Sequence, residues 1–253
     1  ESWNGGVVLF CFFSTFLSIT GVTVLSFFVV KREERGEFVQ GAYRSSAAIL
    51  GIAFIQNIYG TSGMAPLMII GTVPLYNAFA VIVLSLLKPG QRKMDKALLQ
   101  KTLKGIVTNP IILGIAAGFV WAILKIPQPE ILQKTVKNMA VLATPLGLMA
   151  MGASFEGKKA LGKLKPTLIA SALKLVVLAA IFLPIAVWLG YRESELVAIL
   201  VMLGSATTVS SFVMARNMGH EGVLTSSIVM VTTLCSAFTL TGWLFLLKTL
   251  GLV

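Results

Sequence analysis

Charge is what this sequence has least of. Only 12% of its 253 residues are charged and 56% are hydrophobic, whereas soluble domains carry roughly a quarter charged residues. The mean hydropathy is +0.88. This composition excludes an ordinary soluble domain and indicates a chain built from long apolar segments.

Residues that carry chemistry are equally scarce. The chain has a single histidine, His220, and two cysteines, Cys11 and Cys235, both inside apolar runs. We interpret the cysteines as small buried hydrophobic residues, and no disulfide framework is predicted. No metal-binding cluster, nucleophile–base pair or phosphate-binding loop is recognisable in the sequence, so we expect neither an enzyme nor a cofactor.

Carboxylates are missing from the centres of the apolar runs. Proton pumps and antiporters usually place Asp or Glu at mid-membrane depth as a relay. All ten acidic residues instead fall in loops or at the ends of runs: Glu1, Glu33, Glu34, Glu37, Asp95, Glu130, Glu156, Glu193, Glu195 and Glu221. The sequence shown therefore does not predict such a relay.

Long apolar runs are what the sequence does contain. A helix needs about 20 apolar residues to cross a hydrocarbon layer of roughly 30 Å, and none of the runs alternates with period two as a barrel strand would. Eight runs have sufficient length, at residues 5–30, 39–59, 64–87, 105–124, 137–155, 166–190, 196–215 and 223–247. We predict an all-α integral membrane protein with about eight transmembrane helices.

Lysine and arginine gather in alternate loops. The loops at 31–38, 88–104, 156–165 and 216–222 hold 14 of the 21 basic residues. The positive-inside rule places these loops in the cytoplasm and both chain ends on the opposite side. The net charge of +11 then reflects topology and contact with the anionic lipid bilayer, and no nucleic-acid partner is expected.

The chain resembles itself at an offset of 160 residues, without a gap. The matched pairs are Ser45 and Ser205, Asn57 and Asn217, Thr72 and Thr232, and Leu84 and Leu244. The run at 39–59 and its partner at 196–215 would cross the membrane in opposite directions. Inverted repeats of this kind are typical of secondary transporters.

The repeat predicts how the chain is organised. Residues 1–90 would be the remainder of a first repeat, residues 91–104 a cytoplasmic linker, and residues 105–253 a second repeat. The counterparts of the two spans within 105–155 would precede residue 1. We therefore expect a complete protein of ten helices, with two further helices in roughly 55–60 additional residues.

Two short polar stretches lie at the middle of runs that the repeat relates, and they are the strongest candidates for a binding site. If they unwind, half-helix N-termini would face each other at the bilayer centre, which suits an anion. The alternative is close packing of small residues whose hydroxyls bond back to their own helices. The candidates are Ser45, Ser46, Thr207, Thr208, Ser210 and Ser211, with Asn77 and Asn109 as weaker ones.

Two cations lie inside apolar runs. Lys174 is eight residues beyond Pro166, about 12 Å along a helix. A buried ammonium needs a partner, either helix C-terminal carbonyls or a substrate anion, although snorkelling to the interface is an alternative. Arg44 is nearer the cytoplasmic end, and we interpret it as an interfacial anchor.

Four segments resemble the auxin efflux carrier family. Residues 108–114, 144–154 and 205–215 resemble the starts or cores of its sixth, seventh and ninth helices, and 44–60 resembles the fourth. Lys174 matches a basic position that is common in the family's eighth helix. The chain departs from the family at Ser46, where Asn is frequent, and at Ala53 and Ala206, where proline is frequent.

The resemblance implies a ten-helix fold shared with bile-acid symporters and sodium/proton antiporters. The first, second, sixth and seventh helices would form a scaffold, often as a homodimer, and the other six a transport domain around two crossing broken helices. Substrates in the family are organic anions, which include auxin in plants and malate- or malonate-like carboxylates proposed for bacterial members. The short central loop resembles that of bacterial members.

We therefore expect a carrier of a small organic anion in a prokaryotic inner membrane, with the crossing helices and Lys174 at its site. A coupling ion, H⁺ or Na⁺, is compatible with this expectation. One alternative is a sodium-coupled symporter of the bile-acid type. Another is a ligand-binding membrane sensor or scaffold that does not transport.

Overall fold

The structure is a computed structural model that describes residues 4–90, 100, 103–104, 107–108, 110–125 and 127–253. Within these residues the chain is helical apart from turns, extended connections and one isolated backbone bridge between Ser45 and Thr207. Five spans are long and apolar enough to cross a membrane: Gly5–Val29, Ala65–Leu86, Glu130–Ala153, Leu164–Trp188 and Val223–Thr249. The predicted all-α membrane fold is confirmed.

The first half of the chain supplies two of these spans and an interrupted helix between them. It consists of α1 (Gly5–Val29), a 3₁₀ turn (Arg32–Glu34), α2 (Arg35–Tyr43), a π-helical turn (Ala47–Gly51), α3 (Ile52–Tyr59) and α4 (Ala65–Leu86). The run expected at 39–59 is therefore two half-helices, because residues 44–46 between them are not helical. α1 and α4 match the expected runs within a residue at each end.

The second half repeats this pattern after a separate pair of helices. That pair is α6 (Pro110–Leu124) and α7 (Glu130–Ala153), which begins seven residues before the expected run at 137–155. The elements that follow are α8 (Gly157–Gly162), α9 (Leu164–Ala172), a π-helical turn (Leu173–Val177), α10 (Leu178–Trp188), α11 (Glu193–Gly204), α12 (Ser210–Asn217) and α13 (Val223–Thr249). The run expected at 196–215 is also two half-helices.

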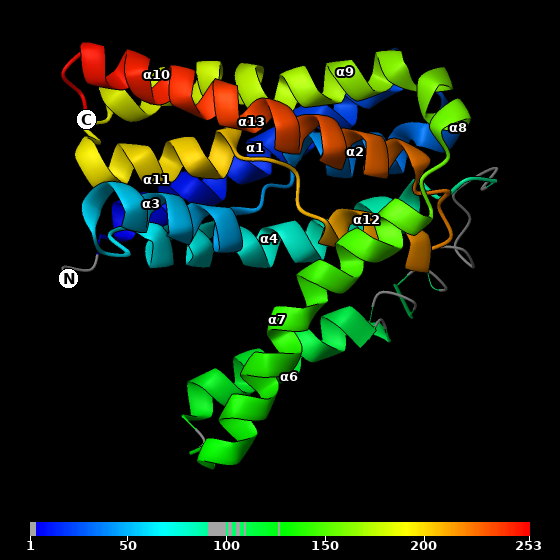
Figure 1. Cartoon of the computed structure of the whole chain (residues 1–253), viewed down its shortest axis with the longest axis horizontal. Coiled ribbons are helices and arrows are strands. Elements are labelled where there is room, and N and C mark those ends of the chain that lie inside the picture. Colours follow the sequence, from blue (N-terminus) through cyan, green and yellow to red (C-terminus); the bar gives the residue numbers. More distant parts are fainter. Residues whose placement is uncertain (1–3, 91–99, 101–102, 105–106, 109, 126) are drawn as a thin grey trace.

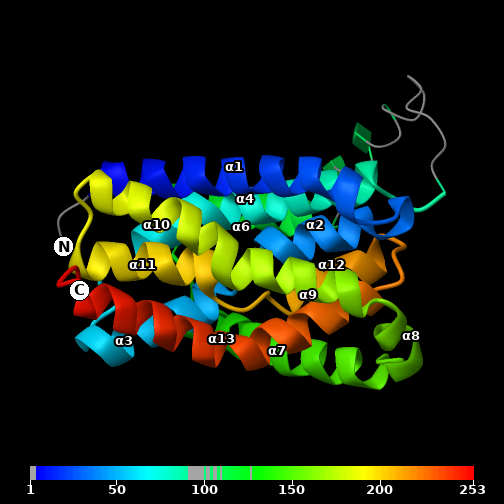
Figure 2. The same cartoon turned by 90° about the horizontal axis from the view of Figure 1, so that it is seen from above.

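The bounds of the elements follow the offset of 160. Adding 160 to the bounds of α1 gives 165–189, within a residue of the span Leu164–Trp188. Adding it to α4 gives 225–246, inside α13. Figures 1 and 2 show that related elements run in opposite directions, α1 against α9 and α10, and α4 against α13. This relation is what an inverted repeat requires.

Most of the labelled helices form one bundle, and α6 and α7 form an arm that projects from it (Figure 1). All nine residues at 196–204 of α11 are buried, as expected for a helix that is apolar on every side. The arm meets the bundle where α7 packs on α12, and Met151 is buried there with Phe212 and Val229. Most other described side chains of the arm are exposed.

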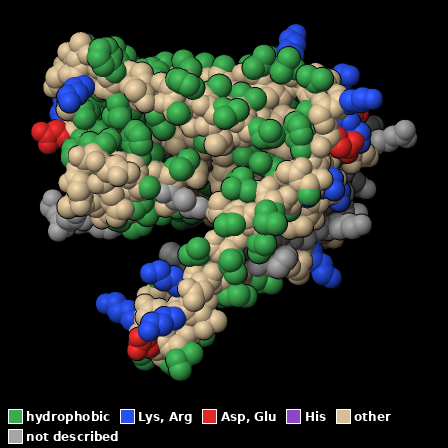
Figure 3. Space-filling model, in the orientation of Figure 1, with side chains coloured by type: hydrophobic (Ala, Val, Ile, Leu, Met, Phe, Trp, Pro, Cys, Tyr) green, Lys and Arg blue, Asp and Glu red, His purple; other side chains and the backbone are tan. Residues whose placement is uncertain are grey.

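Three of the loops predicted to face the cytoplasm, at 31–38, 156–165 and 216–222, gather at one end of the bundle (Figures 1 and 2). Basic side chains are prominent at that end, on the right of Figure 3, and another group lies at the tip of the arm. The loop expected at 31–38 is shorter than predicted, because α2 begins at Arg35. Figure 2 places both chain ends at the opposite end of the bundle.

A buried carboxylate lies in the first turn of α2. Glu37 is only 1% exposed. Its carboxylate oxygens accept hydrogen bonds from the backbone N–H groups of Gly222 and Thr225, each at 2.9 Å, and from the Thr225 hydroxyl at 3.0 Å. The first N–H groups of a helix have no partner within it. Glu37 therefore caps α13 from a neighbouring helix, which a sequence pattern does not reveal.

Close packing of α1 on α4 depends on a glycine. A Cβ atom at Gly71 would lie 2.7 Å from the Val8 carbonyl oxygen and 2.9 Å from the Cys11 Cβ, whereas one at Gly21 would meet nothing within 4 Å. We expect Gly71→Ala to destabilise the detergent-solubilised protein by about 1–3 kcal/mol through overpacking. Gly21→Ala should be neutral or stabilising through helix propensity. Thermal unfolding of both variants tests this, and equal midpoints would contradict it.

Candidate functional site

Both breaks occur at small polar residues. α2 ends at Tyr43, and Arg44 is extended, with φ −78° and ψ 120°. α11 ends at Gly204, and Ser205 is extended, with φ −76° and ψ 162°. Serine and threonine compete with the helix for backbone hydrogen bonds, so runs of them favour such interruptions. The breaks form although neither Ala53 nor Ala206 is a proline.

The two breaks cross and bond to each other. Ser45 and Thr207 form an antiparallel bridge, and the Ser46 N–H donates to the Ala206 carbonyl at 2.9 Å. Ser46 and Ala206 differ by 160, the offset of the repeat. The pseudo-twofold relation between the repeats therefore passes through this contact.

Thr207 ties the crossing to the helices around it. Its hydroxyl donates to the Gly41 carbonyl at 2.7 Å, and its backbone N–H donates to the Thr232 hydroxyl at 3.1 Å. Backbone groups freed by a break must find partners inside a membrane. Here they find them on α2 and α13.

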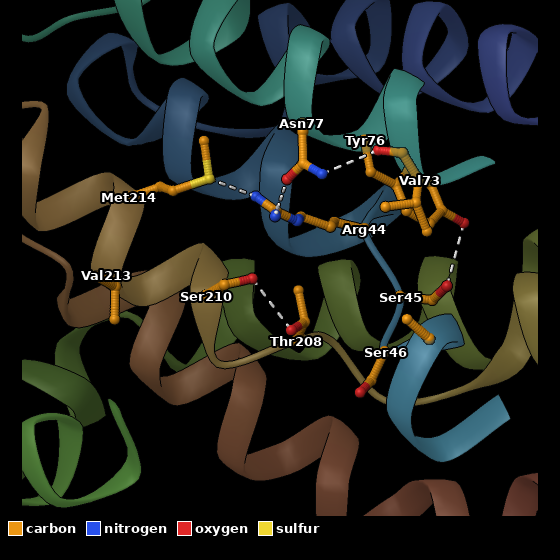
Figure 4. Close-up of a pocket in the computed structure, with 11 residues that line it drawn as sticks. Arg44, Ser45, Ser46, Val73, Tyr76, Asn77, Thr208, Ser210, Val213 and Met214 are labelled. Carbon is orange, nitrogen blue, oxygen red and sulfur yellow. Dashed lines mark hydrogen bonds between the residues drawn. The ribbon is translucent and has the colours of Figure 1, made fainter. Parts of the chain in front are cut away.

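A pocket of about 380 Å³ opens beside the crossing (Figure 4). It collects residues from the first break, from α4 and from the start of α12. Its lining is Arg44, Ser45, Ser46, Ala48, Val73, Tyr76, Asn77, Thr208, Ser210, Val213 and Met214. The pocket is thus a mostly apolar hollow with hydroxyls, one amide and one guanidinium.

Among the described residues, Arg44 is the only charged one that lines this pocket, and its side chain is buried, with 5% exposed. Its Nη2 donates to the Asn77 Oδ1 at 2.6 Å, and its Nη1 lies 2.6 Å from the Met214 sulfur. No carboxylate of the described residues forms an ion pair with it. A buried guanidinium whose neighbours are an amide and a weakly accepting thioether lacks a counter-charge.

Neighbouring amides fix the direction of this guanidinium. Asn77 is itself oriented, because its Nδ2 donates to the Val73 carbonyl at 3.1 Å. With its amide oxygen turned toward Arg44, the buried Gln40 accepts from Nη1 at 3.1 Å and donates to the Ser211 carbonyl at 3.3 Å. Arg44 is therefore held in place without being neutralised.

Tyr76 connects the pocket to the end of α11. Its hydroxyl lies 3.1 Å from the Ser45 hydroxyl and donates to the Met202 carbonyl at 3.4 Å. Figure 4 shows Tyr76 and Ser45 together on one side of Arg44. A change at the first break can thus reach the last turn of α11.

Lys174 binds the same end of α11 but does not line the pocket. It is fully buried, and its Nζ donates to the Met202 carbonyl at 3.2 Å and to the Leu203 carbonyl at 2.6 Å. Of the partners expected for this cation, the structure shows the helix C-terminal carbonyls. A cation at this position balances the negative end of the α11 dipole.

The predicted site residues divide into two groups. Those that line the pocket are Ser45, Ser46, Asn77, Thr208 and Ser210, and those that do not are Lys174, Thr207 and Ser211. The Thr208 and Ser210 hydroxyls lie 3.2 Å apart, whereas the buried Ser211 hydroxyl has no hydrogen-bond partner among the described residues. Asn109 lies outside the residues that the structure describes.

Sequence reasoning missed the apolar lining of the pocket and two of its hydrogen-bonding residues, Arg44 and Tyr76. The interpretation of Arg44 as an interfacial anchor is wrong, because its side chain is buried at the helix break and lines the pocket. The available signal was that Arg44 directly precedes Ser45 and Ser46. Nothing in the sequence marks Tyr76 beyond its position before Asn77.

Residues 2–244 match the family model described as membrane transport protein. A search of curated proteins finds no match.

The hydroxyl of Thr207 provides a test of the crossing. Thr207→Val keeps the shape but leaves the Gly41 carbonyl without this donor, so we expect a loss of about 1–3 kcal/mol in stability. Thr241 is the matched control, because its hydroxyl bonds only to its own exposed helix, at Ala237. Thermal unfolding should show a lower midpoint for Thr207→Val than for Thr241→Val. Equal midpoints would mean that this bond does not hold the crossing.

Proposed function

The chain belongs to the membrane transport protein family, the family of the auxin efflux carriers, and from that premise we propose that it carries a small carboxylate across the membrane by alternating access. The short central loop supports a prokaryotic inner membrane as its location. The site is the pocket at the crossing of the two broken helices.

The observation that carries this proposal is the buried, unneutralised Arg44. A guanidinium has five N–H donors in a planar fork that suits a carboxylate, and the described partners of Arg44, which are Asn77, Met214 and Gln40, are all uncharged. At 4 Å and an effective dielectric constant of 20, opposite charges attract by about 4 kcal/mol. A neutral hydrogen bond contributes about 1 kcal/mol, so the pocket should prefer an anion to a neutral molecule.

Two half-helices add to the positive potential. The π-helical turn that leads into α3 begins at Ala47, directly after the pocket-lining Ser46. α12 begins at Ser210, two residues after the pocket-lining Thr208. The N-terminal ends of helices carry partial positive charge and free N–H groups. Their convergence beside Arg44 supports an anionic substrate.

The arm and the bundle supply the two bodies that alternating access requires. Every residue lining the pocket belongs to the bundle. α7 touches the bundle at α12, where a Cβ at Gly147 would lie 3.0 Å from the Val209 Cγ1. A bundle that contains the whole site can shift against the arm without dismantling the site.

Lys174 supports a carrier that does not need sodium. In a sodium-coupled symporter, carbonyls at half-helix ends coordinate the cation. Here the Lys174 ammonium already bonds to the carbonyls of Met202 and Leu203. Coupling to a proton gradient remains the alternative to test.

Substitution of Arg44 tests the substrate class. Arg44→Gln removes the cation, and we expect counterflow uptake in proteoliposomes to fall at least about tenfold, since hydrogen bonds to charged groups contribute about 1.5–3 kcal/mol. Labelled malate, malonate, a monocarboxylate and an indole acid form the substrate panel. The matched control is Arg192→Gln, an exposed arginine that bonds to the carbonyls of Val187 and Tyr191.

Each outcome of this assay has a meaning. Saturable uptake of one carboxylate that requires Arg44 supports the carrier. Undiminished uptake by Arg44→Gln would remove Arg44 from the site. Ligand-induced stabilisation without any flux would indicate the sensor instead.

Replacing sodium tests the role of Lys174. We expect uptake to be unchanged when sodium is replaced by N-methylglucamine. Lys174→Ala should reduce uptake, because two buried carbonyls of α11 lose their donor. A strict sodium requirement in the unsubstituted protein would favour the symporter of bile-acid type.

A further inference from the structure

A second cavity lies at the end of the bundle where α8 joins the arm to α9. It has a volume of about 350 Å³ and shares no lining residue with the pocket at the crossing. Its walls come from α8, α9, α13 and Phe155, which is two residues beyond the end of α7. They are Phe155, Gly157, Ala160, Leu161, Leu164, Thr167, Ser227, Met230, Val231 and Leu234.

This cavity, called the groove from here on, has a mostly apolar lining, and the hydroxyls in it already form hydrogen bonds. The Thr167 hydroxyl donates to the Lys163 carbonyl at 2.8 Å, and the Ser227 hydroxyl donates to the Val223 carbonyl at 2.8 Å. Leu161 and Leu234 remain 72% and 71% exposed. An open apolar groove in a membrane protein suits an alkyl chain.

Two lysines beside the groove lack an acidic partner. Lys158 follows the lining residue Gly157, and Lys165 follows Leu164. Neither forms an ion pair with any described residue. Figure 3 shows basic side chains at this end of the molecule.

The other two lysines of this segment are already neutralised. Lys159 pairs with Glu156 at 2.9 Å, and Lys163 pairs with Glu221 at 2.7 Å. The hydrogen bond and charge of Lys163 lower the pKa of Glu221. The positive charge left over therefore belongs to Lys158 and Lys165.

From this juxtaposition we propose that the groove is a binding site for an anionic phospholipid. One acyl chain fills the apolar groove, and the phosphate lies between Lys158 and Lys165. Clusters of basic residues at the cytoplasmic end of a transmembrane helix attract anionic lipids, and an adjacent alkyl-sized groove adds a site for the chain. A neutral lipid would leave both ammonium groups without a counter-charge.

The groove lies at the connection between the arm and the bundle. α8 connects α7 of the arm to α9 of the bundle, as Figure 1 shows at its right-hand side. A lipid held against α8, α9 and α13 would brace this connection. The proposal does not depend on which substrate the pocket at the crossing binds.

Lipid binding to the full-length protein in detergent tests the site. Dioleoyl phosphatidylglycerol should remain bound in native mass spectrometry and raise the unfolding midpoint, whereas dioleoyl phosphatidylcholine should do neither. Lys158→Ser with Lys165→Ser should weaken phosphatidylglycerol binding at least about tenfold. Lys137→Ser with Lys248→Ser, a pair of exposed lysines elsewhere, should leave it unchanged.

Two further measurements separate the chain from the head group. Ala160→Phe fills the groove without changing charge and should also weaken lipid binding. Glycerol phosphate, which has no acyl chain, should not stabilise the protein. Equal binding of the two lipids, full binding by the Lys158 and Lys165 double variant, or equal stabilisation by glycerol phosphate would each overturn the proposal.

Discussion

The crossing of two interrupted helices is the constraint on which the rest of the structure depends. Each break frees backbone groups inside the bundle, and such groups cost several kcal/mol if they are buried without a partner. The breaks satisfy one another through Ser46 and Ala206 and are tied to the flanking helices by Thr207. The Lys174 ammonium covers the carbonyls at the end of α11. The pocket lies directly beside this crossing.

The arrangement also explains the chemistry of the pocket. Because most polar groups at the crossing are paired with each other, the pocket retains few that are available to a ligand. Arg44 is held by Asn77 and lacks a carboxylate partner among the described residues. A positively charged site without an internal anion is compatible with the anionic substrate that we propose, which would supply the missing charge.

The sequence predicts the fold well because each membrane span is a long continuous segment that can be recognised from its apolar composition alone. The runs at 5–30, 64–87, 166–190 and 223–247 match helices in the structure closely, and the small polar stretches coincide with the breaks. Contacts between residues far apart in the sequence are not predicted. That Glu37 caps α13, that Arg44 is buried, and that Lys174 lies outside the pocket depend on contacts across more than 25 residues. No local pattern encodes those distances.

The cap that Glu37 provides has a consequence for how the chain is made. Its partner Gly222 is 185 residues further along, so at synthesis rates of about 5–20 residues per second the two are separated by on the order of 10–40 s. During that interval the carboxylate needs water. Because Glu37 lies in the first turn of α2 and not at the middle of a span, its carboxylate can contact water until α13 has been synthesised.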